Sequence, residues 1–308
     1  MKSSPGRPRA RRGFALLAVL WVIVGLGLLY TMAVVAARES VATAQYRVSH
    51  SRAAWRAEGC AELARAASGE AMLDERTATL AWRMLDSVVA PALLPDMQCA
   101  VELRASGTTL DANRADESRL EALLRAAGVD SAGADSLADA ILDWRDADDE
   151  PRPNGAERWW YRAAGKLAPR NGAFADAAEL RLVRGLAGVS GIDTLLGVDA
   201  GRVELARAPP AVVASLPGFG DEAVARLAEL RFRGEEPREL LALSAALSPG
   251  AREAMLARYS ELSQLVTPEP DAWTLVARAT DGGGATAEVE LRLVRAGSRI
   301  AIVRRRTA

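Results

Sequence analysis

An uncharged stretch near the N-terminus, FALLAVLWVIVGLGLLYTMAVVAA from Phe14 to Ala37, decides the fold. As a helix with a rise of about 1.5 Å per residue, its roughly 24 residues would extend about 36 Å. The hydrocarbon core of a bilayer is about 30 Å thick, so the stretch is long enough to cross it. The rest of the chain has no second apolar run of this kind, which predicts a single membrane span.

The leader at residues 1–13 is basic and carries no acidic side chain. Its charged residues are Lys2, Arg7, Arg9, Arg11 and Arg12. Because basic flanks stay in the cytoplasm, this predicts a cytoplasmic N-terminus in the inner membrane, with the bulk of the chain in the periplasm. A secretory signal peptide is the alternative, but its apolar region is shorter, about 7–15 residues, and ends at a small-x-small site.

The helix predicted for the span continues beyond it. Residues 38–67 favour helix and contain no Pro. Val41, Val48 and Trp55 recur at intervals of seven and form one stripe. We expect one helix of about 50 residues, whose first half lies in lipid and whose second half packs on a soluble domain.

Composition excludes several kinds of chemistry. The 308 residues hold 39 basic and 40 acidic side chains, one His and two Cys. A net charge of −1 gives no whole-protein electrostatic argument for nucleic-acid binding. The single His, His50, excludes multi-histidine metal sites, and no phosphate-binding loop, nucleophile elbow or H-E-x-x-H motif is present. The sequence therefore predicts that the protein is not an enzyme.

The junction Arg11-Arg12-Gly13-Phe14 resembles the type IV prepilin class, in which a basic leader, Gly and Phe precede the apolar helix. The resemblance implies that a prepilin peptidase cuts between Gly13 and Phe14 and methylates the new N-terminal Phe14. Most members of the class have Glu at the fifth mature position, where this chain has Ala18. That departure is similar to type II secretion system protein K, a minor pseudopilin.

The middle of the chain carries the rest of this resemblance. Residues 110–125 read LDANRADESRLEALLR, a strand-like end, a turn and an amphipathic helix. Residues 141–161 read ILDWRDADDEPRPNGAERWWY, and an E-L…V-x-G segment follows at residues 179–185. This order of motifs is similar to that of the protein K family.

The resemblance implies an α+β protein with a pilin-like fold, a long N-terminal helix packed on a small antiparallel sheet, and a large inserted all-α domain. The expected parts are a leader (1–13), a transmembrane segment (14–37), the periplasmic helix with the first strands (38–109), the insert (110–265) and the C-terminal strands (266–308). The insert is expected to contain two helix-hairpin-helix-like units, 110–200 and 201–265.

Residues 203–216 (VELARAPPAVVASL) are a near-repeat of residues 110–123, which predicts a strand-turn-helix unit used twice. The second copy leads into Pro217–Gly220, a hairpin like those that bind DNA phosphates. Arg226, Arg231 and Arg233 follow it, but Asp221 and Glu222 surround it with negative charge. A tight structural turn is favoured over a nucleic-acid site.

An acidic group is the candidate metal site. Its members are Asp143, Asp146, Asp148, Asp149 and Glu157. Calcium prefers such oxygen ligands in a Pro- and Gly-rich loop, although the spacing is not that of an EF-hand. The alternative is a solvated surface paired with Arg145, Arg152 and Arg158. Calcium is also suggested by the resemblance, since pseudopilins commonly bind it.

The two cysteines, Cys60 on the late part of the first helix and Cys99 in a strand-like stretch, are candidates for a disulfide, with two free thiols as the alternative. Three further strands are predicted from residues 272–305, with alternating apolar positions. Arg304, Arg305 and Arg306 are interpreted as an exposed basic end.

The function implied by the resemblance is that of a minor pseudopilin, which forms and caps the tip of the periplasmic pseudopilus. The implied partners are the minor pseudopilins I and J, the major pseudopilin, the prepilin peptidase and the inner-membrane platform. No nucleic acid is expected. The alternatives are a membrane-anchored DNA-binding protein and a minor pilin of a surface pilus.

Overall fold

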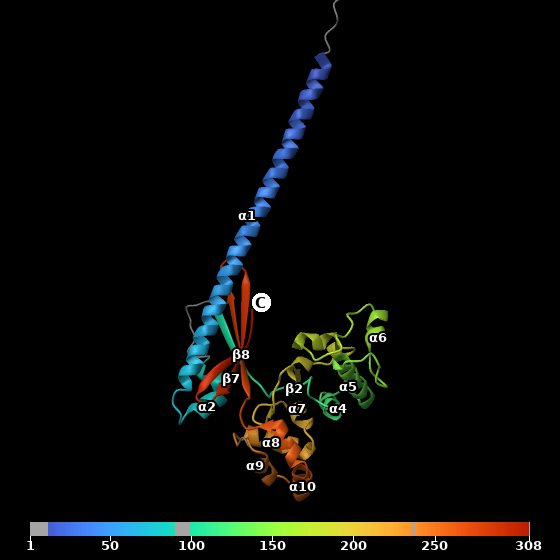
Figure 1. Cartoon of the computed structure of the whole chain (residues 1–308), viewed down its shortest axis with the longest axis vertical. Helices are drawn as coiled ribbons and strands as arrows, with labels where there is room; N and C mark the ends of the chain where they lie inside the picture. Colours follow the sequence, from blue (N-terminus) through green and yellow to red (C-terminus); the bar gives the residue numbers. More distant parts are fainter. Residues whose placement is uncertain (1–11, 90–98, 236–237, 308) are drawn as a thin grey trace, which may run out of the picture.

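The computed structural model describes residues 12–89, 99–235 and 238–307, and residues 1–11 of the leader lie outside them. One helix, α1 (Arg12–Ala71), runs for 60 residues and projects from a body of two lobes (Figure 1). The predicted continuous helix is confirmed. It is longer than the expected 50 or so residues, because no Pro interrupts it before Ala71.

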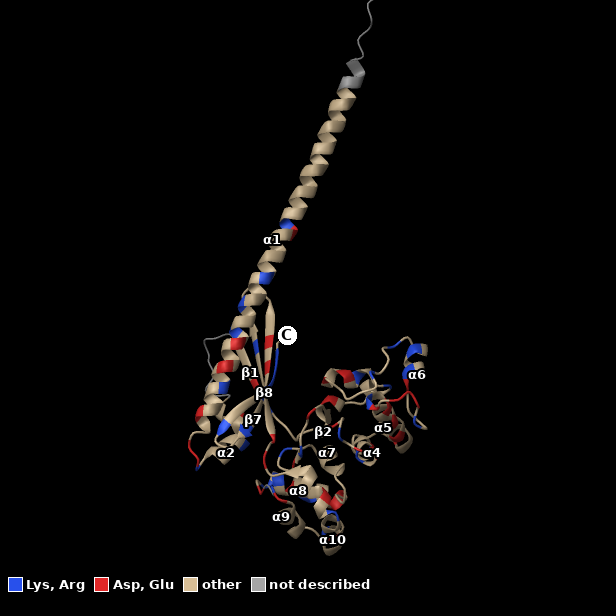
Figure 2. Ribbon diagram, viewed as in Figure 1, with Lys and Arg blue, Asp and Glu red and all other residues tan. Residues whose placement is uncertain are grey.

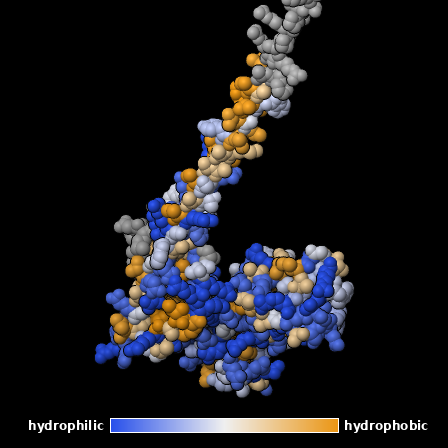
Figure 3. Space-filling view, turned by 45° about the horizontal axis from the view of Figure 1, so that its top comes forward, coloured by the Kyte–Doolittle hydropathy of each residue, from blue (hydrophilic) through white to orange (hydrophobic). Residues whose placement is uncertain are grey.

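From Leu16 to Ala37, α1 carries no charged side chain on any side. The segment Leu16–Ala71 contains a window long and apolar enough to cross a membrane, and none of that window is buried in the body. Figure 2 shows no blue or red on the coloured helix above the first charged turn beside the α1 label, and Figure 3 shows mostly hydrophobic colours there. Exposure of an all-apolar helix fits a single membrane anchor.

The first lobe is pilin-like, with a four-stranded antiparallel sheet of order β1-β6-β7-β8. The strands are β1 (Cys99–Ala105), β6 (Ala272–Thr280), β7 (Thr286–Ala296) and β8 (Arg299–Thr307). The lower half of α1 packs on one face of this sheet. The four predicted strands and the helix on their sheet are therefore confirmed.

The buried face of α1 consists of small side chains. Ala53, Ala57, Cys60, Ala61 and Ala64 are all fully buried against the sheet. The side chains of the stripe of Val41, Val48 and Trp55, in contrast, are 55%, 50% and 77% exposed. The stripe is thus not the packing face, because small side chains let the helix axis approach the sheet closely and bulky ones do not.

Two tryptophans close the lower end of the first lobe, below α1. Short helices α2 (Ala78–Arg83) and α3 (Leu85–Val89) follow α1. Trp82 Nε1 donates to the Pro270 carbonyl at 2.7 Å, and Trp273 Nε1 donates to the Trp82 carbonyl at 2.8 Å. Both indoles are therefore buried with their polar atoms satisfied.

The second lobe is helical and is inserted between β1 and β6 (Figure 1). Its α-helices are α4 (Glu117–Ala126), α5 (Ser131–Arg145), α6 (Arg158–Ala163), α7 (Pro210–Ala214), α8 (Asp221–Phe232), α9 (Leu240–Ala245), α10 (Pro249–Ala257) and α11 (Tyr259–Leu265). Three 3₁₀ turns lie between α6 and α7, namely η2 (Ala177–Leu182), η3 (Leu186–Gly188) and η4 (Ile192–Thr194).

The near-repeat corresponds to two strand-turn-helix units. The short strand β2 (Leu110–Asp111) pairs in parallel with β3 (Leu196–Gly197) and leads to α4. The short strand β4 (Val203–Glu204) pairs in parallel with β5 (Val266–Thr267) and leads to α7. The two units share a single core that extends from Leu110 to Val266. β5 belongs to this lobe, although its residues fall within the range expected for the C-terminal strands.

The three arginines near the C-terminus are not a free basic tail, because each pairs with an acidic residue, although Arg305 is exposed as predicted. They lie on β8, and successive residues of a strand point to opposite faces. Arg305 pairs with Glu58 of α1 on one face. Arg304 and Arg306 pair with Asp199 and Asp176 of the helical lobe on the other. β8 therefore connects both lobes.

Candidate functional site

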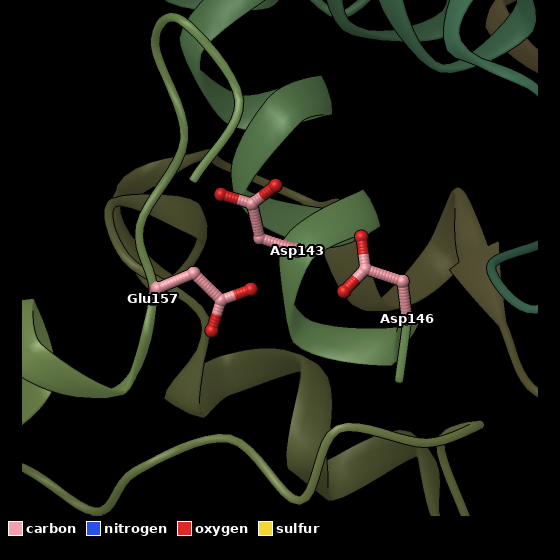
Figure 4. A group of neighbouring side chains, drawn as sticks. All are labelled: Asp143, Asp146 and Glu157. Carbon is pink, nitrogen blue, oxygen red and sulfur yellow. The ribbon is translucent and has the colours of Figure 1, made fainter. Parts of the chain in front are cut away.

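The acidic group lies where α5 ends and α6 begins. Asp143 is on the last turn of α5, Asp146 is its C-cap, and Glu157 is the N-cap of α6. One carboxylate oxygen from each of these residues lies within 4.8 Å of the others. Figure 4 shows the three side chains converging on one space.

This carboxylate group is buried and incompletely hydrogen-bonded. Asp143 and Glu157 have no exposed surface. Glu157 Oε1 and Asp146 Oδ1 are buried and have no hydrogen-bond partner. A buried acceptor without a protein partner is costly, and these two oxygens are therefore available to a ligand.

The electrostatics of the group favour a cation. Burial, reinforced by the charges of Asp143 and Asp146, raises the pKa of Glu157 to about 7, although the Arg158 N–H opposes this. Burial also raises the pKa of Asp143 and of Asp146. The charge of Arg152, whose Nε lies 3.6 Å from Asp143 Oδ1, offsets only part of the increase in the pKa of Asp143. Like charges held together in a buried site are relieved by a bound cation.

The loop from 150 to 157 is shaped by α5. The Asn154 N–H donates to Asp139 Oδ2 at 2.9 Å, and the Arg152 N–H donates to Asp143 Oδ1 at 3.2 Å. Gly155 lies directly against Asp143, and a Cβ there would come within 1.9 Å of Asp143 Oδ2. The sequence Asn-Gly-Ala-Glu thus allows the loop to approach α5 and positions Glu157 beside Asp143.

The structure brings together three of the five predicted metal ligands. Asp148 and Asp149 lie outside the group: Asp148 Oδ1 accepts the Glu150 N–H, and Asp149 Oδ1 accepts from Asn171 and lies 3.2 Å from Arg158 Nε. Asp139, which holds the loop, and Gly155, which packs on Asp143, were not among the predicted site residues. The spacing of Asp139 and Asp143, four residues apart on one helix, was the available signal.

The side chains in the group fit a calcium ion in donor chemistry. All the available atoms are oxygens, three carboxylates converge, and two buried oxygens lack partners. Calcium is bound by six to eight oxygens, of which carboxylates and carbonyls are typical.

The two cysteines form a disulfide between α1 and β1. Cys60 and Cys99 are bonded, with their Cα atoms 6.6 Å apart. Cys60 is fully buried. The bond therefore fastens the helix to an edge strand of the sheet.

The hairpin at Pro217–Gly220 has a structural explanation. Gly218 has φ +77°, and a Cβ there would come within 2.9 Å of the Ala254 carbonyl. Arg231 donates to the Leu205 and Ala208 carbonyls, and Arg226 pairs with Glu229. Arg233 lies 3.7 Å from Glu229. The arginines that would contact a phosphate are therefore engaged within the lobe.

The other sequence candidates lie on α1. Gly13 and Phe14 are in its first turn, where side chains are outside the described part. Ala18 is in the apolar segment, with no acidic neighbour in sequence. His50 is exposed, and its ring centroid lies 6.1 Å from that of Tyr46.

Comparison with known proteins supports the resemblance. Residues 99–190 match the family model described as type II secretion system (T2SS), protein K. This segment contains β1 and all three carboxylates of the acidic group. A search of curated proteins finds no sequence match.

In fold, the chain is similar to a chain of a solved structure, the GspK-GspI-GspJ complex from the enterotoxigenic Escherichia coli type 2 secretion system. The TM-score is 0.60 at 16% identity, and the match covers 88% of this chain and 99% of that chain. The likeness in fold thus extends well beyond the segment that the family model matches.

Proposed function

We propose that this chain, a member of the type II secretion system protein K family, is a minor pseudopilin that caps the tip of the periplasmic pseudopilus. The observation that carries the proposal is the family match over residues 99–190. The matched segment lies within a fold similar to that of one chain of the GspK-GspI-GspJ complex. The pseudopilus would drive the export of folded proteins across the outer membrane.

The shape of the chain supports a capping position. The helical lobe stands beside the pilin-like lobe and makes the body much wider than a helix on a sheet (Figure 1). A subunit of this width is difficult to stack repeatedly along a filament of closely packed helices. Ala18 also offers no carboxylate to pair with the N-terminal amine of a subunit above, as expected for a terminal subunit.

We place the N-terminus in the cytoplasm and the body in the periplasm. The basic leader, residues 1–13, supports this orientation. The prepilin peptidase would cut between Gly13 and Phe14 and methylate Phe14, which leaves a mature chain anchored by α1. We propose a structural and not a catalytic role, because the family model that residues 99–190 match describes a component of a secretion system.

The partners in this proposal are the minor pseudopilins I and J, then the major pseudopilin and the inner-membrane platform. The exposed stripe of Val41, Val48 and Trp55 runs down α1 from the membrane segment. It provides an apolar surface for the anchored helix of a neighbouring subunit.

Co-purification in detergent tests this proposal. Full-length chain carrying an affinity tag is expressed together with I and J, and we expect the three to be recovered in one complex. Trp55→Glu places a charge on the stripe and is expected to lower the recovery of I and J several-fold. Phe232→Glu is the matched control, because Phe232 is 93% exposed but lies on the helical lobe. Failure of the wild-type chain to bring down I and J would contradict the proposal.

We propose that Asp143, Asp146 and Glu157 hold a calcium ion, which would neutralise the group and fasten the loop 150–157 to α5. Calorimetric titration of the full-length chain with calcium is expected to give saturable heat and a higher melting temperature. Asp146→Asn should remove both effects, whereas Asp148→Asn, in the same loop but outside the group, should keep them. No heat and no thermal shift with the wild-type chain would exclude calcium.

The rival function, DNA binding through the Pro217–Gly220 hairpin, is not favoured, because Arg226, Arg231 and Arg233 are engaged within the lobe. An electrophoretic mobility assay with the full-length chain at low salt is expected to show no shift. A shift lost on Gly220→Pro would instead support that rival.

A further inference from the structure

A cavity of about 420 Å³ lies at the junction of the sheet and the helical lobe. Arg292 of β7 and Arg304 of β8 contribute to its lining from the sheet. Arg114 contributes from the turn between β2 and α4, with Asp111 beside it, and Asp199 contributes from the loop before β4. Three guanidinium groups from distant parts of the sequence therefore surround one space.

Two of these arginines lie opposite each other on neighbouring strands. Arg292 and Arg304 are directly paired in the register of β7 and β8. The register shift between Arg292 and Leu293 places the extra residue, Val303, beside them. Like charges directly opposite one another destabilise a sheet unless another group compensates them.

Asp199 contacts both Arg292 and Arg304. Its carboxylate Oδ2 lies 2.6 Å from Arg304 Nη1, and its carbonyl accepts from Arg292 Nη2 at 2.5 Å. Asp199 has φ +57°, a backbone conformation that costs energy in a residue with a side chain. The loop thus directs both Oδ2 and the carbonyl oxygen of Asp199 toward the sheet.

Arg304 has two carboxylate partners, Asp199 and Glu290, whereas Arg292 and Arg114 have none among the described residues. The Asp111 carboxylate accepts the backbone N–H groups of Asn113 and Ala200, and Glu290 lies 3.5 Å from Arg304. In the described part of the chain, Arg292 has no carboxylate partner, and Arg114 makes neither a hydrogen bond nor an ion pair. Burial lowers the pKa of Arg292, and its charge is therefore held at a cost.

We propose that this cavity is a binding site for an oxyanion, a carboxylate or phosphate group, held by Arg114, Arg292 and Arg304. The planar fork of each guanidinium suits two oxygens of such a group. The bound anion supplies the negative charge that Arg292 and Arg114 lack. It also joins the sheet to the helical lobe, since Arg114 belongs to that lobe.

Thermal unfolding of the full-length chain in detergent tests the site, with inorganic phosphate as the probe. Phosphate replaces chloride at constant ionic strength, so that general screening stays the same. The melting temperature of the wild-type chain is expected to rise with phosphate and to saturate. Arg114→Gln is expected to weaken the apparent phosphate affinity about tenfold, because it removes one charge-assisted interaction.

Arg114→Gln suits the test because Arg114 is exposed and holds no other part of the fold. Arg162→Gln, an exposed arginine on α6, is the matched control and is expected to respond to phosphate like the wild type. No saturable rise in the wild type, or an equal rise in Arg114→Gln, would overturn the proposal.

A second experiment identifies the source of the anion. Only this experiment depends on the proposed function, because it uses the complex with I and J. Phosphate is titrated into the complex with I and J. Loss of the phosphate effect there assigns the site to a carboxylate of a bound subunit, and its persistence assigns it to a free anion. If no complex forms, the assembly proposal fails while the phosphate result on the single chain still stands.

Discussion

Gly155 lies against the carboxylate of Asp143 so closely that a Cβ at position 155 would come within 1.9 Å of Asp143 Oδ2. Asp143 is fully buried on α5, and Gly155 is in the loop that carries Glu157. The acidic group therefore depends on the absence of a side chain at one loop position.

Gly155→Ala is expected to displace the loop from α5 and to destabilise the chain by about 1–3 kcal/mol, the usual cost of overpacking. It should also reduce the thermal response to calcium, because Glu157 moves with the loop. The measurement is urea unfolding followed by tryptophan fluorescence, with EDTA and with calcium.

Gly172→Ala is the control for this change. A Cβ at Gly172 meets no atom within 4 Å, so the free energy of unfolding should stay within about 0.5 kcal/mol of the wild type. Equal stability of Gly155→Ala and Gly172→Ala would show that the close approach of Gly155 to Asp143 has no energetic consequence.

Glu157 makes the stability of the metal-free chain depend on pH. Its pKa is raised from 4.5 to about 7 in the folded chain, mainly by burial. Between these values the folded state holds more protons than the unfolded state. The contribution of Glu157 to stability is therefore full below pH 4.5 and is lost as the pH rises through 7, a loss of at most about 3 kcal/mol.

The measurement compares the wild-type chain with Glu157→Gln in EDTA at pH 5 and pH 7.5. The wild type should lose more stability than the variant over this interval, since Gln does not ionise. Calcium at pH 7.5 should restore the wild type and leave the variant nearly unchanged. Parallel pH dependence of the two proteins would contradict the raised pKa.

Periodicity and spacing were sufficient to predict the continuous α1, the strands of the sheet and the repeated strand-turn-helix unit, because these patterns are local. The acidic stretch likewise indicated Asp143, Asp146 and Glu157. It did not separate them from Asp148 and Asp149, since the path of the loop beyond α5 depends on contacts with Asp139 and Asn171.

The packing face of α1 and the place of the three arginines near the C-terminus both depend on tertiary contacts. The bulky stripe of Val41, Val48 and Trp55 was more conspicuous than the alanines that α1 buries, because hydrophobic periodicity gives weight to large side chains. Three successive arginines were interpreted as a chain end. They point to two faces of β8 because they belong to a strand, and they pair there with Glu58 of α1 and with two aspartates of the helical lobe.

Gly13→Ala is expected to block removal of the leader. In the prepilin class the peptidase cuts after a Gly, and Gly13 occupies that position before Phe14 in this chain. Intact-mass analysis of the purified chain should show a precursor that keeps residues 1–13, and secretion should stop. Gly6→Ala, also in the leader, is the control and should be cut normally. A Gly13→Ala chain that is cut and supports secretion would exclude the cleavage site.

The disulfide between Cys60 and Cys99 closes a loop with a sequence separation of 39 residues. On the chain-entropy model, such a loop stabilises the folded state by about 4 kcal/mol. The double variant Cys60→Ser, Cys99→Ser is expected to lose about 2–5 kcal/mol of unfolding free energy, measured with urea under oxidising conditions. Dithiothreitol should lower the stability of the wild type by a similar amount and leave the double variant unchanged. Labelling with iodoacetamide after non-reducing denaturation should find no free thiol in the wild type, and modification of both cysteines would show that the bond between α1 and β1 does not form.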